Sequence, residues 1–302
     1  MFAKELIKSF LFIFVSVIIT MCDRGTVKNT DWELVSSGFD FPEGPAWNMS
    51  NTLYLSNCYG NWIAAITGDT VDTLAISSNE TFTATNGLFT DNDGNIYACD
   101  FKKKMILEIS ESGTFNVLVS DCIGDSLNRP NDLVLDGSRN IYFTDPKSYG
   151  AEKPDGKIYR FNLDSEELSV TADSLDFPNG LGISPIDKML YVSESAMCRI
   201  LRFQIADDGS LYNREVFAEL PGGDPDGLDF DVRGNLYAAS FGYGSVFVIS
   251  PEGKIIQCIK TPGKKPSNLE FGDSDLRTLF LTEVETNSVY KIRTRFPGQK
   301  KW

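Results

Sequence analysis

Acidic and amide side chains recur in this chain at one fixed place in a repeated pattern. Each copy begins with such a residue and continues with an apolar run, a polar turn and a second apolar run, and successive copies start 42 to 48 residues apart. Carboxylate and amide oxygens are the ligands that hard divalent cations prefer. If the copies meet in space, their side chains will form an oxygen-lined cation site. The six residues are Glu43, Asn86, Asn131, Asn179, Asp226 and Asn268.

The number of copies decides between this interpretation and an ordinary structural one. A lone Asn or Asp in such a place usually caps a turn by hydrogen bonding to nearby backbone groups. Six copies, with a charged carboxylate in place of the amide at Glu43 and Asp226, favour a shared binding site. Two negative charges match a divalent cation, so we expect calcium first, with magnesium, manganese and zinc as alternatives.

The complete absence of histidine narrows the chemistry further. Ser-His-Asp and Cys-His nucleophile systems, His general bases and HExxH zinc sites all need an imidazole. The six cysteines include no CxxC pair, which argues against a zinc cluster. Cys99 and Cys258 lie in apolar runs, where a buried free thiol is at least as reasonable as a disulfide. Carboxylate chemistry and metal chemistry remain.

The elements that must position these residues are short strands. From Arg129 to Asp145, an apolar run, the turn DGSRN and a second apolar run predict strand, tight turn and strand. Two further strand-like runs follow in most copies, so each repeat supplies four strands. A period in the forties with four strands per unit is typical of propeller blades. We therefore predict an all-β, six-bladed β-propeller over residues 30–295 as one domain, with a polar tail at 296–302.

The sixth repeat lacks a fourth strand before the chain reaches this tail. The run from Trp32 to Ser37 precedes the first repeat and has no other assignment. We predict that this N-terminal strand completes the last blade and closes the ring. Because the first strand of each blade lines the axis of a propeller, the six recurring residues should form a ring at one axial mouth.

Several copies also resemble the motifs of a known family. The pieces FPEGPAW, RPNDLV, FTDP, FPNG and PDGLDFD are similar to those of the gluconolactonase family, which includes regucalcin (senescence marker protein 30) and the bacterial lactonases. Diisopropyl fluorophosphatase is a more distant resemblance. The similarity extends over about residues 33–293. It implies a catalytic divalent metal whose ligands are Glu43, Asn131, Asn179 and Asp226.

The substrate side of the site carries one match and several departures. The resemblance implies that Arg129 binds substrate and that Asn131 approaches the metal or the substrate, and we add Asn86 from the same ring as a substrate contact. A substrate-binding Glu of regucalcin has no counterpart, since Tyr149 stands at its distance from Asn131. The histidine of the fluorophosphatase is absent, which weakens that activity. The histidine dyad of the six-bladed paraoxonases is absent too, which excludes them.

Together these assignments predict a hydrolase that opens a lactone ring, with a sugar or aliphatic lactone as its small-molecule substrate. The metal would polarise the carbonyl, Asp226 would act as general base on water, and Arg129 would orient the substrate or stabilise the oxyanion. The alternative is a non-catalytic propeller of the NHL or strictosidine-synthase-like kind that binds a ligand or a protein. Carboxylates directed into the axis at Glu43 and Asp226 favour the enzyme.

Charge and the N-terminus bear on partners and location. A net charge of −14 repels phosphate groups, so nucleic acid is not an expected partner. Residues 1–21 carry lysines and then an apolar run, typical of a signal peptide. The residues before Cys22 resemble a bacterial lipobox, although Met21 replaces the usual small residue, so plain secretion or a retained N-terminal anchor stays open. We expect a monomer exported to the periplasm or cell envelope, with membrane contact only through a lipid on Cys22.

Overall fold

The computed structural model describes residues 32–78, 82–120, 126–150 and 152–300. The predicted signal peptide and the predicted lipid site at Cys22 lie outside the described residues. Within those ranges, no helix is long and apolar enough to cross a membrane. The one helix there is the short 3-10 helix η1 (Ser195–Met197), and the remaining regular structure is β-strand.

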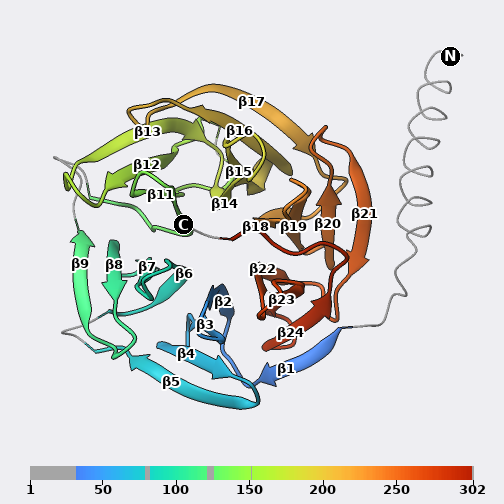
Figure 1. Cartoon of the computed structure of the whole chain (residues 1–302). Coiled ribbons are helices and arrows are strands. Elements are labelled where there is room, and N and C mark those ends of the chain that lie inside the picture. The colour runs from blue at the N-terminus through green and yellow to red at the C-terminus, as the bar shows by residue number, and fades with distance from the viewer. Residues whose placement is uncertain (1–31, 79–81, 121–125, 151, 301–302) are drawn as a thin grey trace, which may run out of the picture.

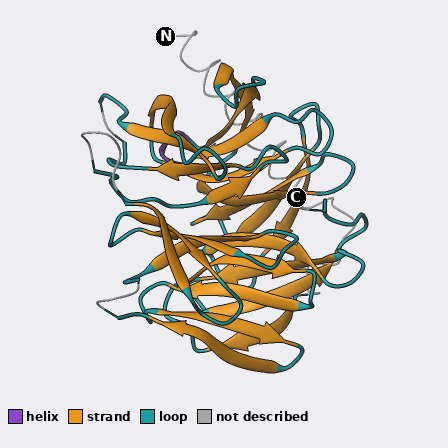
Figure 2. Ribbon diagram, turned by 60° about the vertical axis from the view of Figure 1, so that its left-hand side comes forward, coloured by secondary structure: helices purple, strands orange, loops and turns teal. Residues whose placement is uncertain are grey.

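The strands form six antiparallel sheets of four strands each, arranged as blades around one axis (Figure 1). Figure 2 shows the same ring turned, with the strands in orange. The predicted six-bladed propeller is confirmed. From the axis outward, blade 1 is β2 (Pro42–Asn48), β3 (Thr52–Asn57), β4 (Trp62–Thr67) and β5 (Thr70–Ile76), and blade 2 is β6 (Thr85–Thr90), β7 (Ile96–Asp100), β8 (Met105–Ile109) and β9 (Phe115–Val119). Blade 3 is β10 (Leu133–Leu135), β11 (Asn140–Asp145), β12 (Gly156–Asn162) and β13 (Leu168–Leu175), and blade 4 is β14 (Pro178–Ile183), β15 (Leu190–Glu194), β16 (Arg199–Ile205) and β17 (Leu211–Glu219). Blade 5 is β18 (Asp224–Phe230), β19 (Leu236–Phe241), β20 (Ser245–Ile249) and β21 (Ile255–Lys260), and blade 6 is β22 (Pro266–Gly272), β23 (Thr278–Glu283), β24 (Ser288–Arg293) and β1 (Glu33–Ser37).

The first strand of the chain completes the last blade, as predicted. β1 pairs antiparallel with β24, with Glu33 opposite Lys291 and Ser37 opposite Ser288. Trp32 extends this contact to blade 5, because its indole NH donates a hydrogen bond to the carbonyl of Lys260 at 2.8 Å. Backbone hydrogen bonds within one sheet therefore join the two ends of the propeller.

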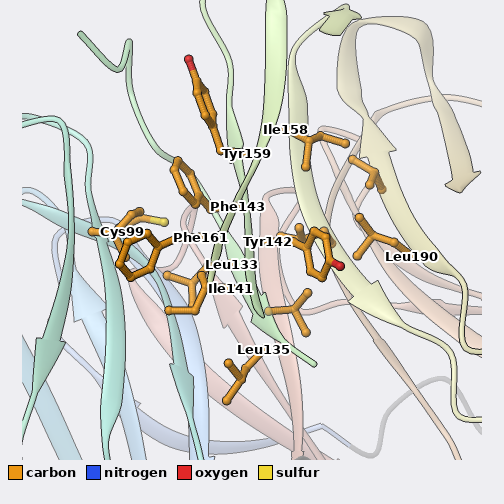
Figure 3. Close-up of a cluster of buried hydrophobic side chains, with 14 of the residues drawn as sticks. Cys99, Leu133, Leu135, Ile141, Tyr142, Phe143, Ile158, Tyr159, Phe161 and Leu190 are labelled. Carbon is orange, nitrogen blue, oxygen red and sulfur yellow. The ribbon is translucent and has the colours of Figure 1, made fainter. Parts of the chain in front are cut away.

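Apolar side chains between neighbouring blades hold the ring together. Alternate residues of a strand point to opposite faces of its sheet. In β11, Ile141 and Phe143 lie on the side of Cys99 from blade 2, whereas Tyr142 lies toward Leu190 of blade 4 (Figure 3). All five side chains are fully buried. A blade thus buries both faces of its sheet only by contact with its two neighbours. A single repeat, although it is the repeating unit of the sequence, is therefore not expected to fold alone.

The innermost strands approach one another closely, and glycines after the recurring polar residues allow this. A Cβ at Gly44 would lie 2.2 Å from the carbonyl oxygen of Asn86, and one at Gly180 would lie 2.3 Å from that of Asp226. The pairing of first and second strands shifts register at this same place in blades 1, 2, 4, 5 and 6. Such bulges bend a strand and re-aim its side chains. Here they bring polar residues of successive blades side by side at the axis.

The C-terminal segment that follows β24 reaches one end of the axis through Gln299. The backbone NH of Gln299 donates a hydrogen bond to the carbonyl of Phe230 at 3.1 Å, and its side-chain amide donates to the carbonyl of Ile183 at 2.9 Å. Ile183 and Asn179 lie toward opposite ends of β14. The C-terminal segment and the recurring polar residues therefore occupy opposite ends of the axis.

Candidate active site

Five of the six recurring residues line one cavity at the open end of the axis. The cavity measures about 250 Å³. Three of the predicted site residues in its lining are buried: Glu43, Asn179 and Asp226 are 4%, 8% and 8% exposed. Every residue that the sequence assigned to metal, substrate or catalysis lies in this lining. The set is Glu43, Asn86, Arg129, Asn131, Asn179 and Asp226.

The sixth recurring residue, Asn268, does not line this cavity, so the expectation of a complete six-membered ring is wrong. Its side chain fills the space beside Gly227, where a Cβ would lie 1.8 Å from the Asn268 Oδ1. Its amide nitrogen donates a hydrogen bond to Asp132 at 3.3 Å, and its side chain also hydrogen-bonds Glu43. Asn268 therefore supports two of the acidic side chains, Asp132 and Glu43, from blade 6.

A third carboxylate, Asp132, lies close to the two predicted ones and was missed by sequence reasoning. It is 7% exposed, and its negative charge raises the pKa values of both Glu43 and Asp226. In the repeat it follows Asn131 directly, at a position where four other blades have glycine. This replacement of glycine by a carboxylate was the available signal.

Burial makes the charged forms of Glu43 and Asp226 costly. Loss of hydration is the main reason that the pKa of Glu43 rises from 4.5 to about 8, and repulsion from Asp132 adds to it. Loss of hydration, followed by repulsion from Glu43, likewise raises the pKa of Asp226 well above its ordinary value. Hydrogen bonds from the Gly44 NH to Glu43, at 3.0 Å, and from the Asn179 side chain to Asp226 oppose these shifts. A positive charge beside both carboxylates would favour their ionised forms.

The donor atoms of the cavity fit a hard divalent cation. In the part of the chain that the structure describes, no three His, Cys, Asp or Glu side chains gather as metal ligands. A cation here would therefore need the amide oxygens of Asn131 and Asn179 in addition to the carboxylates of Glu43 and Asp226. Mixed carboxylate and amide oxygens are typical of calcium sites. Cys58 also lines the cavity, but burial raises the pKa of its thiol well above its ordinary value, so it stays protonated and is a poor ligand.

Arg129 is the one cationic side chain among the described residues that line this cavity. Its backbone NH donates a hydrogen bond to Asp145 at 2.7 Å, and its guanidinium lies 5.9 Å from the centre of the Phe177 ring. Asp145, at the end of β11, also accepts two hydrogen bonds from the backbone NH of Asn128. The carboxylate of Asp145 thus fixes the segment that carries Arg129 without lining the cavity itself.

The walls of the cavity are aromatic, which the sequence did not predict. The Phe41 ring contacts Tyr59 and Phe241 at centroid distances of 5.1 and 6.5 Å, and the Tyr149 ring contacts Phe177 at 5.4 Å. Two sequence features could have indicated this: the repeated Asp-Phe-Pro tripeptide and the tyrosine that replaces an expected glutamate. The rings come from five blades and belong to Phe41, Tyr59, Phe101, Tyr149, Phe177 and Phe241.

The raised pKa of Glu43 predicts how the stability of chelator-treated protein depends on pH. This carboxyl has a pKa near 4.5 in the unfolded chain and about 8 in the folded protein. The folded state holds the proton more tightly, so the contribution of this group is complete below about pH 4.5 and is lost as the pH rises to about 8. We expect the urea midpoint of chelated protein to fall across this window and calcium to suppress the fall. Urea unfolding at a series of pH values, with and without calcium, measures both.

Two variants sharpen this pH measurement. Glu43→Gln removes one of the two carboxyls with raised pKa values and should reduce the fall, whereas Glu219→Gln, an exposed position on β17, should leave it unchanged. A constant midpoint in chelated wild-type protein would contradict an uncompensated buried carboxyl at position 43.

The fold and the site together define a six-bladed propeller with an acidic and amide-lined cavity at one end of its axis. Residues 41–285 match the family described as SMP-30/Gluconolactonase/LRE-like region, and the chain belongs to this family. The resemblance stated from the motifs is thereby confirmed.

Individual relatives agree with this assignment. A gluconolactonase from Zymomonas mobilis is 28% identical over 89% of this chain and 83% of its own length. The solved structure of a gluconolactonase from Xanthomonas campestris is 31% identical, covers 89% of each chain and superposes with a TM-score of 0.76. Diisopropyl-fluorophosphatase from Loligo vulgaris is 28% identical over 70% of this chain and 72% of its own. By name these relatives are hydrolases, so the family is one of enzymes.

Proposed function

We propose that this protein is a divalent-cation-dependent lactonase with calcium as its preferred ion. The observation that carries the proposal is the gathering of two buried carboxylates, amide oxygens and one arginine in a single open cavity. A propeller that only binds a protein or ligand gains nothing from carboxylates whose charged forms burial disfavours, so this observation argues against the non-catalytic alternative. Relatives named gluconolactonase and lactonase support the reaction class.

In this proposal Glu43, Asn131, Asn179 and Asp226 hold the cation. When bound, it supplies Lewis-acid polarisation of the lactone carbonyl. With their charges compensated, both carboxylates ionise near neutral pH despite their burial. Asp226 is then able to accept a proton from water.

Asp226 acts as the general base. One of its oxygens takes a proton from water as the water oxygen bonds to the carbonyl carbon, and it returns the proton to the ring oxygen when the carbon–oxygen bond breaks. Arg129 orients the substrate through its NH donors or stabilises the developing negative charge on the carbonyl oxygen. Asn86 and Asn131 present amide groups to the polar edge of the lactone. The product is an open-chain hydroxy acid.

Metal removal and restoration test the proposal. The purified protein would be treated with chelator and assayed on sugar, aliphatic and aryl lactones with calcium, magnesium, manganese or zinc restored. We expect hydrolysis only with an added cation and most with calcium. No hydrolysis of any lactone or ester with any cation would refute the proposed enzymatic function. It would favour the alternative, a non-catalytic propeller that binds a ligand or a protein. A melting temperature that changes neither with chelator nor with added calcium would separately refute the cation site.

We also propose that the chain is exported and held at the membrane by a lipid on Cys22, with the propeller acting as a monomer. The support comes from the apolar segment that precedes this cysteine. Membrane fractionation of wild type and Cys22→Ser checks the anchor, because the variant should move to the soluble fraction.

A further inference from the structure

Two phenylalanines at the mouth of the cavity adopt a backbone conformation that bulky residues avoid. Phe41 has a φ of 61° and Phe177 a φ of 57°, and among the described residues they are the two aromatic residues with positive φ. Both occupy the centre of an Asp-Phe-Pro tripeptide directly before the first strand of a blade. Strained backbone of this kind concentrates at ligand clamps and active sites, where surrounding contacts maintain it.

The same pair of hydrogen bonds maintains both conformations. The carbonyl of Phe41 accepts from the NH of Cys58, and the carbonyl of Phe177 accepts from the NH of Ser195, each at 3.1 Å. The NH of the residue before each phenylalanine donates to the polar side chain that ends the second strand of its blade, at 2.6 and 2.8 Å. Blades 1 and 4, which are far apart in the sequence, thus use the same hydrogen-bond arrangement to place a phenylalanine ring at the cavity.

The walls offer few free polar atoms to a substrate that carries many hydroxyl groups. The Tyr149 hydroxyl donates a hydrogen bond to Asp224 at 2.9 Å, and the Ser195 hydroxyl donates to the carbonyl of Pro225 at 2.7 Å. The groups that could replace a substrate's hydrogen bonds to water belong to the proposed catalytic and binding residues, such as Asn86, Arg129 and Asn131, and the rest of the lining is mostly aromatic. Both phenylalanine rings are half-buried and line the cavity, so they present apolar surface to an occupant instead.

We propose that Phe41 and Phe177 clamp a flat apolar ring, and that the substrate class is lactones fused to or substituted with an aromatic ring. This inference rests on the proposed lactonase function and narrows the expected sugar or aliphatic lactone. Aromatic rings favour stacked or edge-to-face partners. The Arg129 guanidinium lies 5.9 Å from the Phe177 ring centre, so a hydrogen-bond donor for the lactone oxygens lies beside one of the two rings. The 250 Å³ cavity is below the roughly 300–1,000 Å³ typical of drug-sized ligands, which suits a small bicyclic molecule.

The test compares an aryl lactone, dihydrocoumarin, with a sugar lactone, glucono-δ-lactone, and adds a binding probe that cannot be hydrolysed. That probe is 2-tetralone, the carbocyclic analogue of dihydrocoumarin. The variants Phe41→Asn and Phe177→Asn remove each ring, and Asn tolerates positive φ, so the backbone should remain in place. Tyr212→Asn on β17, 52% exposed, is the matched control for loss of an aromatic ring.

We expect wild-type protein to prefer dihydrocoumarin, and each phenylalanine variant to lose about 10- to 100-fold in kcat/KM for it and similarly in 2-tetralone affinity. The loss in kcat/KM for glucono-δ-lactone should be several-fold smaller than the loss for dihydrocoumarin, and the calcium-induced rise in melting temperature should change little. Tyr212→Asn should match wild type throughout. A wild-type preference for glucono-δ-lactone, or unchanged 2-tetralone affinity in both variants, would overturn the clamp. Absence of all lactone hydrolysis would overturn the proposed function alone, since 2-tetralone binding is read independently.

Discussion

Asp226→Asn should lower kcat for lactone hydrolysis by about 1,000-fold, within the range expected for loss of a general base. The substitution keeps a neutral oxygen that can still face a cation, but it removes both the negative charge and the group that accepts a proton from water. The expected loss is therefore mainly in kcat at saturating cation, with a smaller loss of cation affinity. Steady-state kinetics at several calcium concentrations separate the two.

Two comparisons make the Asp226 experiment decisive. Asp72→Asn, an exposed substitution on β5, should leave kcat unchanged. The melting temperature of Asp226→Asn should still rise with calcium, which shows that the cavity is intact. Turnover of the variant within about twofold of wild type would assign the general base to another group and contradict the mechanism.

Glu43→Gln should have opposite effects on metal-free and calcium-loaded protein. Without cation, the buried carboxylate is disfavoured by lost hydration and by repulsion from Asp132, so its removal should stabilise the fold near pH 8 by on the order of 2 kcal/mol. With calcium, the variant should lose most of the stabilisation that wild type gains, because a ligand and a charge are missing. At 100 times Kd that gain is about 2.7 kcal/mol. Urea unfolding of both proteins with chelator and with calcium measures whether the order of their stabilities reverses.

The matched control for Glu43→Gln is Glu219→Gln, whose carboxylate is exposed. It should follow wild type under both conditions. A Glu43→Gln variant that is less stable than wild type without cation and equally stabilised by calcium would show that Glu43 is structural, and would remove it from the cation site.

The sequence was sufficient to predict the ring of blades because the repeat spacing shows which residues occupy equivalent positions in successive blades. The copies 42 to 48 residues apart place equivalent residues at equivalent depths, so Glu43, Asn179 and Asp226 could be expected to meet at the axis. Closure by residues 32–37 followed from a missing strand in the sixth repeat. These inferences need only the order and number of strands.

The direction of individual side chains could not be predicted in this way. Asn268 occupies the same repeat position as Asn179, yet it turns away from the cavity into the space beside Gly227. Asp132 contributes its charge because glycine on the neighbouring strand, Gly87, leaves room for its carboxylate, at 2.2 Å from where a Cβ would lie. Such outcomes depend on the residue across the blade interface, which repeat alignment does not compare.

Pairing of β1 with β24 also has a consequence for how the protein is made. Glu33 emerges from the ribosome among the first propeller residues, and its partner Lys291 emerges among the last. Blades 1 to 5 can assemble in order during synthesis, but the final blade cannot form until β24 (Ser288–Arg293) has been translated. Contacts between residues so distant in sequence form slowly. A chain that stops before residue 288 would leave its first described strand without the partner that closes the ring.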